Sequence, residues 1–346
     1  MKQDKYIRQI ALPQVGEQGQ QKLHQARVLV IGAGGLGNAV LPYLASSGIG
    51  AIGIVDGDAV SLSNLHRQVL FAETDIGQPK ADVAYKKLSA QFPETEITAY
   101  NAFLSGENAL ELFAGYDMIV DATDSIAIRY LINDACVLSK KPFVHASVYR
   151  FQFQVAVFNV GGSGTYRCLY PTPPKSVQNC AEAGVMPTTV ALAGLFQCNE
   201  VLKYFLNIGE LLTNEVMLFD VLQNQEERFK YQPKDHSFVT EAFFYESYQE
   251  VELTAFANVR EDGLLLDVRE VDELPELSIK NYLQLPLSEL ENNLADISRE
   301  KPIYIFCQTG KRSKQAYQLL KQQKSDQVFC LIENAPEINK LISTDL

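Results

Sequence analysis

The chain has 346 residues, of which 47% are hydrophobic and 21% are charged, a composition typical of globular proteins and a length that suits two domains. Its net charge of −12 argues against nucleic acid and anionic membranes as partners, because both attract basic surfaces. Six cysteines suggest no disulfide scaffold, and no apolar stretch near the start could serve as a signal peptide, so we expect a cytoplasmic protein.

The first elements expected are an arm and a buried strand. Residues 1–27 are polar and amphipathic and include Tyr6-Ile7-Arg8-Gln9, which predicts a helical arm that packs on a neighbour. Residues 28–31 are four consecutive apolar residues, three of them β-branched. This run predicts a strand buried on both faces.

A glycine-rich turn connects this strand to the next helix. Its glycines are Gly32, Gly34, Gly35 and Gly37. Because glycine lacks a Cβ, the backbone can approach an anion closely, and unpaired amides at the helix start point at it. The next strand, residues 52–55, ends in Asp56, an acid placed to bind a ribose hydroxyl. The pattern predicts a nucleotide site that fits NAD, FAD or ATP about equally.

Polar residues after Asp56 favour ATP. Asn64, Arg67 and Lys80 follow it closely. A dinucleotide enzyme has little need for two extra cations here, whereas a triphosphate does. Lys80 opens a helix expected over residues 80–92, and residues 97–100 read as a third strand.

Another buried strand, at residues 116–120, ends in acids. Ligands gather at the carboxyl ends of strands in an open α/β sheet, so Asp121 and Asp124 are expected on the same edge as Gly35 and Asp56. A magnesium ion could bind there. The pattern further predicts a helix at 129–138, strands at 142–146 and 151–160, an interrupted apolar helix at 185–206, and strands at 215–219 and 227–231.

Several motifs in one order resemble the ThiF/MoeB/HesA adenylyltransferases, bacterial relatives of ubiquitin-activating enzymes. The motifs are Tyr6-Ile7-Arg8-Gln9, the glycine turn, Val55-Asp56-Gly57-Asp58, residues 61–68, residues 77–80, Asp121-Ala122-Thr123-Asp124 and Cys180-Ala181-Glu182-Ala183-Gly184-Val185. The resemblance covers residues 1–235 and implies an α/β fold with a Rossmann-like sheet of the ubiquitin-activating-enzyme topology.

The resemblance also implies a chemistry. Family members use ATP and magnesium to adenylate the C-terminal Gly-Gly carboxylate of a ubiquitin-like sulfur carrier, and cations stabilise the phosphate charge. By position, Arg67 and Lys80 hold the phosphates and Asp124 holds magnesium, while Asp56 binds the ribose and Asn64 orients the nucleotide. Further implied nucleotide contacts are Asp58, Ser63, Leu65, His66 and Ser125. Arg8 is implied to reach the partner subunit's site, so a homodimer is expected.

Two cysteine positions bear on metal and covalent chemistry. Relatives hold structural zinc with two Cys-x-x-Cys pairs, but here the first pair reads Thr165-Tyr166-Arg167-Cys168 and residues 224–240 contain no cysteine, so we expect no structural zinc. Cys180 lies in a polar segment where a thiol can be accessible and reactive. The resemblance implies that it forms a thioester or acyl disulfide with the carrier, and the sequence does not choose between them.

A linker at 236–255 and a second domain at 256–346 are expected next. Residues 263–269 predict a strand ending in charge, and residues 302–306 predict a strand leading straight into Cys307-Gln308-Thr309-Gly310-Lys311-Arg312, before a helix at 313–323. Backbone amides and the nearby cations Lys311 and Arg312 would stabilise a thiolate or persulfide anion. This resembles the active loop of a smaller α/β rhodanese-like domain, whose opening motif matches residues 266–269.

The rhodanese resemblance has limits and consequences. The spacing from Cys307 to Arg312 is shorter than in tyrosine phosphatases, which favours sulfur over phosphate. The glycine signatures usual in rhodaneses are replaced at residues 281–283 and 333–336, so the support of the loop is altered. Cys136, Cys198 and Cys330 are expected in the core.

The combined interpretation is an enzyme that adenylates a sulfur carrier and then transfers persulfide sulfur, with a persulfide donor such as a cysteine desulfurase. The small subunit of molybdopterin synthase is the favoured carrier over the thiamine-thiazole carrier. Two alternatives of other classes are an NAD-dependent oxidoreductase and a non-catalytic scaffold that binds carriers.

Overall fold

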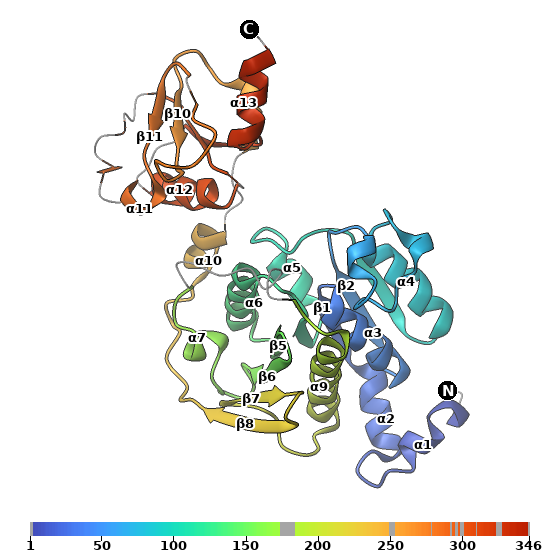
Figure 1. Cartoon of the computed structure of the whole chain (residues 1–346). Helices are drawn as coiled ribbons and strands as arrows, with labels where there is room; N and C mark the ends of the chain where they lie inside the picture. Colours follow the sequence, from blue (N-terminus) through green and yellow to red (C-terminus); the bar gives the residue numbers. More distant parts are fainter. Residues whose placement is uncertain are drawn as a thin grey trace. The chain divides into compact units, whose positions relative to one another are not determined.

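The computed structural model describes residues 3–173, 184–248, 253–277, 279–290, 293–294, 297, 301–308, 310–322 and 327–344. The chain divides into two compact units, residues 1–248 and 249–346, shown from blue to yellow-brown and from orange to red in Figure 1. Helix α10 (Glu241–Tyr248) lies within the segment expected as a linker, and its Phe244 is fully buried in the first unit.

The first unit is built on an eight-stranded sheet of order β3-β2-β1-β4-β5-β6-β7-β8. Its strands are β1 (Arg27–Ile31), β2 (Ala51–Val55), β3 (Glu96–Tyr100), β4 (Met118–Asp121), β5 (Phe143–Tyr149), β6 (Gln152–Phe158), β7 (Glu215–Asp220) and β8 (Gln225–Lys230). The pairs from β3 to β5 are parallel and those from β5 to β8 antiparallel. The chain leaves β1 for β2 and β3 and returns on the other side to β4, so the loops after β1 and β4 lie next to each other at the carboxyl ends of the strands, where open α/β sheets bind ligands.

Helices cover both faces of this sheet (Figure 1). They are α2 (Gly16–Gln25), α3 (Gly35–Ser46), α4 (Lys80–Gln91), α5 (Ala109–Ala114), α6 (Ile126–Ser139) and α9 (Pro187–Leu206), with the short η1 (Gln3–Tyr6), α1 (Ile7–Ile10), η2 (Leu62–Asn64), η3 (Glu73–Asp75) and α7 (Tyr166–Leu169). Val28 and Val30 pack into a core with α3, α4 and α9, whereas Leu29 and Ile31 pack into a second core with α5 and α6. The expected burial of this strand on both faces is confirmed, because successive side chains point to opposite faces.

Helix α9 confirms the helix expected in the interrupted apolar stretch. Its first residue is Pro187, which needs no N–H donor at that position. Two of the polar residues that interrupt the stretch bond inside the protein: Gln197 Nε2 donates to the Asp121 carbonyl at 2.7 Å, and Glu200 Oε2 accepts from Leu212 N at 3.0 Å. Within the described ranges, no helix has the length and apolar character needed to cross a bilayer.

The second unit contains a five-stranded parallel sheet of order β11-β10-β12-β13-β9. Its elements are β9 (Leu253–Thr254), η4 (Phe256–Asn258), β10 (Leu264–Asp267), β11 (Tyr282–Gln284), α11 (Leu287–Leu290), β12 (Ile303–Phe306), α12 (Lys311–Gln322), β13 (Val328–Leu331) and α13 (Ala335–Thr344). Ile303 and Ile305 face one core of this unit, and Tyr304 and Phe306 face the other. Cys307 follows directly at the carboxyl end of this central strand.

The three cysteines expected in the core are confirmed there. Cys136 on α6, Cys198 on α9 and Cys330 on β13 are 0%, 3% and 1% exposed. Burial raises the pKa of Cys198 and of Cys330 to about 12. These thiols are therefore neutral packing groups at physiological pH.

Candidate functional site

The glycine turn after β1 is held tightly against the neighbouring loop after β4. Gly32 has a φ of +101°, and a Cβ there would lie 2.7 Å from the Ala122 carbonyl oxygen. A Cβ on Gly37 would lie 2.1 Å from the Gly32 carbonyl oxygen. These two glycines are therefore required by the protein's own backbone packing, independently of any ligand.

The other two glycines differ in what they face. A Cβ on Gly35 would lie 2.6 Å from Val190 Cγ1 on α9, so its missing side chain is also explained by helix packing. At Gly34 the nearest atom to an added Cβ is Gln68 Nε2 at 3.8 Å. The open side of the turn is therefore at Gly34, where a ligand has room to meet the backbone at the start of α3.

Asp56, at the end of β2, ties its own loop to the glycine turn. Its carboxylate accepts from Ala33 N at 2.7 Å and from Asp58 N at 2.8 Å. Burial raises the pKa of Asp56, against the lowering effect of these two N–H donors and of Lys80. A carboxylate has about four lone-pair sites, so two acceptor positions are left for a ribose, and that role remains a prediction.

Lys80 and Asp58 form an ion pair beside Asp56. Lys80 Nζ lies 2.9 Å from Asp58 Oδ2, and Lys80 N donates to the Asp58 carbonyl at 2.9 Å. The Lys80 side chain is 6% exposed and that of Asp58 is 58% exposed. The ammonium group is thus held by buried packing at the first residue of α4, while water screens the carboxylate that faces it.

The guanidinium of Arg67, beside the glycine turn, is not paired with a described carboxylate. It donates to two neutral acceptors, Asn64 Oδ1 at 2.7 Å and the Ser63 carbonyl at 3.2 Å. Its Cγ and Cδ lie 3.6 Å from where a Gly35 Cβ would be, which places the side chain against the glycine turn. Arg67 forms no ion pair with any carboxylate of the described residues, so its guanidinium is available to a phosphate. Leu65 and His66 belong to the same turn.

The two acids at the carboxyl end of β4 have opposite surroundings, although both lie at the expected edge of the sheet. Asp121 is fully buried: its Oδ2 lies 2.6 Å from His145 Nδ1, and its Oδ1 accepts from Thr123 N at 3.1 Å and Thr123 Oγ1 at 2.7 Å. Asp124 is exposed and has no hydrogen bond or ion pair with another residue in the described part of the chain. Ser125, expected at the nucleotide, caps α6 by accepting from Ile128 N at 3.4 Å.

The Asp121–His145 pair is ionised on the aspartate. Burial raises the pKa of Asp121, but the hydrogen bond from His145, the charge of Arg129 and the hydrogen bond from Thr123 outweigh it and leave the pKa below its usual value. Burial lowers the pKa of His145. A neutral imidazole therefore donates its Nδ1 proton to a carboxylate, and this pair fixes the loop on which Asp124 is carried.

Sequence reasoning missed the roles of two buried polar residues. His145, on β5, stands opposite Asp121 in the parallel register of β4 and β5. Gln68 is 3% exposed beside Gly34, and its Oε1 has no hydrogen-bond partner among the described residues. A histidine inside an apolar strand is the signal in the first case. No signal marks Gln68, because its burial depends on tertiary packing.

Two predicted residues stand apart from this cluster. Arg8 is exposed on α1, and its reach into a partner subunit stays a prediction. Cys180 lies outside the described residues, so its predicted reactivity stays a prediction as well.

The segment expected to lack zinc contains a thiol–imidazole contact. Cys168 Sγ lies 3.0 Å from His236 Nε2 and accepts from Thr165 N and Lys234 N, both at 3.3 Å. Among the described residues no group of three or more His, Cys, Asp or Glu side chains is arranged to hold a metal. The hydrogen bonds at Cys168 thus join residue 165 to residues 234 and 236.

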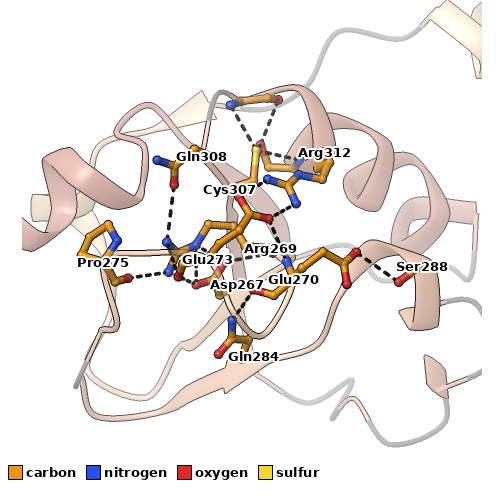
Figure 2. A network of polar contacts seen from close by, with 12 residues as sticks. Asp267, Arg269, Glu270, Glu273, Pro275, Gln284, Ser288, Cys307, Gln308 and Arg312 are labelled. Carbon is orange, nitrogen blue, oxygen red and sulfur yellow. Dashed lines mark hydrogen bonds and ion pairs between the residues drawn. The ribbon is translucent and has the colours of Figure 1, made fainter. Parts of the chain in front are cut away.

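In the second unit, Cys307 lies in a nest of backbone amides between β12 and α12. Its Sγ accepts from Gly310 N at 3.1 Å and Ser313 N at 3.4 Å, and Figure 2 shows the thiol above the polar cluster of the β10 loop. The side chain is 1% exposed and lines a cavity of about 80 Å³ together with residues 331–334. That volume suits a small group such as an added sulfur atom.

At the two positions where the usual rhodanese glycines are absent, residues 281–283 and 333–336, other residues support the local backbone. Asn281 adopts a left-handed φ of +54°, and its Nδ2 donates to the Glu261 carbonyl at 2.7 Å. Glu333 and Asn334 line the Cys307 cavity, and Ala335 N donates to the Cys307 carbonyl at 3.1 Å. Arg312, expected to stabilise the thiolate, forms an ion pair with both oxygens of Glu273 and remains near enough to Cys307 to interact with its charge.

Comparisons with known proteins match both units. The ThiF family profile matches residues 6–240, and the rhodanese-like domain profile matches residues 252–336. A sulfur carrier protein adenylyltransferase of Thermus thermophilus is 48% identical over 227 residues, covering 64% of this chain and 84% of that protein. An adenylyltransferase and sulfurtransferase MOCS3 of Aedes aegypti is 34% identical over 362 residues, covering 93% and 82%.

Solved structures show the same fold. The crystal structure of E. coli MccB has a TM-score of 0.60 at 23% identity, covering 67% of this chain and 71% of that one. At this identity the likeness concerns the α/β architecture.

Proposed function

We propose that this chain adenylates a sulfur carrier with ATP and then supplies the sulfur itself. The chain belongs to the ThiF family and also carries a rhodanese-like domain. Membership implies ATP use and the activities of an adenylyltransferase and sulfurtransferase. One observation carries the proposal: a free guanidinium, Arg67, faces the open glycine turn in one unit, and a thiol held by backbone amides, Cys307, ends the central strand of the other.

In the adenylation step, the C-terminal Gly-Gly carboxylate of a ubiquitin-like carrier attacks the α-phosphorus of ATP. A carboxylate oxygen–phosphorus bond forms, the bond to the β-phosphate breaks, and pyrophosphate leaves. Arg67 and Lys80 stabilise the charge on the phosphates, and Asp56 and Asn64 position the nucleoside.

Asp124 is the residue that we propose for magnesium, because its carboxylate is exposed and unpaired within the described ranges, and carboxylate oxygen is a ligand that magnesium prefers. A magnesium ion would offset the phosphate charge there. Asp121 is not proposed, since its oxygens already accept from Thr123 and His145.

In the sulfur step, Cys307 holds sulfane sulfur as a persulfide, received from a persulfide donor such as a cysteine desulfurase. Cys180 is proposed to bond covalently to the carrier: its thiolate attacks the acyl-adenylate to give a thioester, or a persulfide on it attacks to give an acyl disulfide, and AMP leaves in either case. Mass spectrometry of a trapped carrier complex tests this bond directly.

We further propose that the protein is cytoplasmic, that it forms a homodimer, and that it holds no structural zinc. Arg8 is proposed to act in the partner's site, because it is exposed on α1 and no described carboxylate neutralises it. The Cys168–His236 contact supports the absence of zinc, because it already satisfies the sulfur with hydrogen bonds.

The favoured carrier is the small subunit of molybdopterin synthase, with the thiamine-thiazole carrier as the alternative. Carrier-dependent ATP–pyrophosphate exchange, run with each carrier and with each carrier lacking its terminal Gly-Gly, distinguishes them. If neither carrier supports exchange while ATP still binds, the adenylation proposal is wrong. A thermal-shift comparison of ATP with NAD tests the oxidoreductase alternative, and retained cellular function of Arg67→Ala and Lys80→Ala would support the scaffold.

A further inference from the structure

Both arginines of the described polar cluster beside Cys307 are neutralised by carboxylates. Arg269 is fully buried, and its Nη2 lies 2.7 Å from Asp267 Oδ2. The Arg312 guanidinium meets both oxygens of Glu273, with Nη2 at 2.7 Å from Oε2. Figure 2 shows the Glu273 carboxylate lying between the Arg312 guanidinium and the rest of the cluster, on the side next to Cys307.

Glu273 is aimed at Arg312 by a turn of the backbone. Glu270 N donates to Glu273 Oε1 at 2.9 Å, Glu273 N donates to the Glu270 carbonyl at 3.2 Å, and Arg269 Nη1 donates to the Glu273 carbonyl at 3.4 Å. The hydrogen bond with Arg312 is the main reason that the pKa of Glu273 falls to about 2. The carboxylate is therefore charged throughout the physiological pH range.

None of the described residues that line the cavity beside the thiol is a cation. The lining includes Glu333, whose carboxylate Oε2 accepts from Phe256 N at 2.8 Å. A small dianion such as thiosulfate brings two negative charges to a Cys307 thiolate. A persulfide with an uncharged body brings one, so the repulsion that it must overcome is smaller.

We propose that Glu273 is a specificity-determining residue: by holding Arg312 it withholds the guanidinium from small dianionic sulfane donors and reserves Cys307 for persulfides. This inference depends on the proposed sulfurtransferase function. In the favoured reaction the Cys307 thiolate attacks the outer sulfur of R–S–S⁻, one S–S bond forms as another breaks, and RS⁻ leaves. With thiosulfate the same attack would release sulfite, so neither reaction needs an oxidant or a reductant.

The test uses the full chain with two donors, thiosulfate and 2-hydroxyethyl persulfide, and measures formation of the Cys307 persulfide by mass and by rate. For Glu273→Gln, which frees the Arg312 charge, the ratio of kcat/KM for thiosulfate to that for the persulfide should rise about tenfold or more. Glu270→Gln is the matched control, because this carboxylate lies on the same turn but accepts from Ser288 Oγ at 3.3 Å, and its ratio should stay at the wild-type value. The double variant Glu273→Gln with Arg312→Gln should lose the gain.

An unchanged ratio in Glu273→Gln, with a wild-type chain that accepts persulfide sulfur, overturns the inference and leaves the proposed function standing. A wild-type chain that uses thiosulfate as well as the persulfide also overturns it. A wild-type chain that forms no Cys307 persulfide from either donor instead contradicts the proposed sulfur transfer. If Glu273→Gln does not fold, Glu273→Ser removes the same charge and must give the same rise.

Discussion

Replacing His145 by Ala should destabilise the first unit strongly, because it leaves Asp121 buried without its main donor. The two side chains are both 0% exposed, and the Nδ1–Oδ2 distance is 2.6 Å. Removing the partner of a buried charge costs about 3–5 kcal/mol, because the charge is left uncompensated. Thr123 still donates two hydrogen bonds to Asp121, and Arg129 Nε lies 3.9 Å from its Oδ2, so we expect the lower end, about 3 kcal/mol.

The matched variant is His145→Asn, which places an amide N–H where the Nδ1 proton was. It should recover about half of the lost free energy or more. Urea unfolding followed by circular dichroism measures both variants in the full chain, since the sequence has no Trp to report by fluorescence. The ATP–pyrophosphate exchange rate should follow the same order, because Asp121 fixes the loop that carries Asp124.

The effect should also depend on pH. Burial lowers the pKa of His145 in the folded state, so below its unfolded pKa of about 6.5 the unfolded chain binds the extra proton and the wild type loses stability as the pH falls. The variant His145→Ala lacks this proton. The difference between the two should therefore shrink by up to about 1.4 kcal/mol per pH unit below that value. Equal stability of wild type and His145→Ala at pH 7, or an Asn variant as unstable as the Ala variant, would refute the reasoning.

Three further outcomes follow from the sites. Arg67→Ala should lower carrier-dependent ATP–pyrophosphate exchange by about 10²–10³-fold with little change in melting temperature, whereas Arg228→Ala, an exposed change on β8, should leave exchange unaltered. Cys307→Ser should abolish persulfide formation and spare exchange; loss of both activities in a folded variant would contradict the division of labour between the two units. Metal analysis of the purified chain should find no stoichiometric zinc, and Cys168→Ala should lower the melting temperature without any change in metal content, because His236 and two backbone amides lose their acceptor.

The parallel strands, and the residues at their carboxyl ends, were predictable from the sequence for a physical reason. A parallel strand covered on both faces must be apolar at consecutive positions, as at residues 28–31 and 303–306. The glycines that follow residues 28–31 mark a turn whose backbone has a positive φ and packs too closely for a side chain. Asp56, Lys80 and Cys307 lie directly beside these elements in the sequence. Local pattern therefore sufficed to place them at the carboxyl ends of strands.

The sequence could not distinguish acids that follow the same strand. Asp121 and Asp124 both come at the end of β4, and only His145, which is 24 residues away from Asp121, determines that one of them points inward. Arg312 poses the same problem, because Glu273 reaches it across a separation of 39 residues. Charge pairing between distant segments is set by the packed sheet, and no local pattern encodes it.

The two candidate sites both lie at the carboxyl end of a parallel strand, but they differ in whether their arginines are paired with carboxylates. In the first unit Arg67 donates to neutral acceptors and keeps a free positive charge, which a triphosphate requires as charge accumulates on the leaving pyrophosphate. In the second unit Arg269 and Arg312 are each held by a carboxylate, and the described partners of the Cys307 sulfur are two backbone amides and the Ser313 hydroxyl, none of them charged. A site built in this way stabilises one negative charge on sulfur and offers little to a polyanion, so ATP and its pyrophosphate product should not compete with sulfur loading at Cys307.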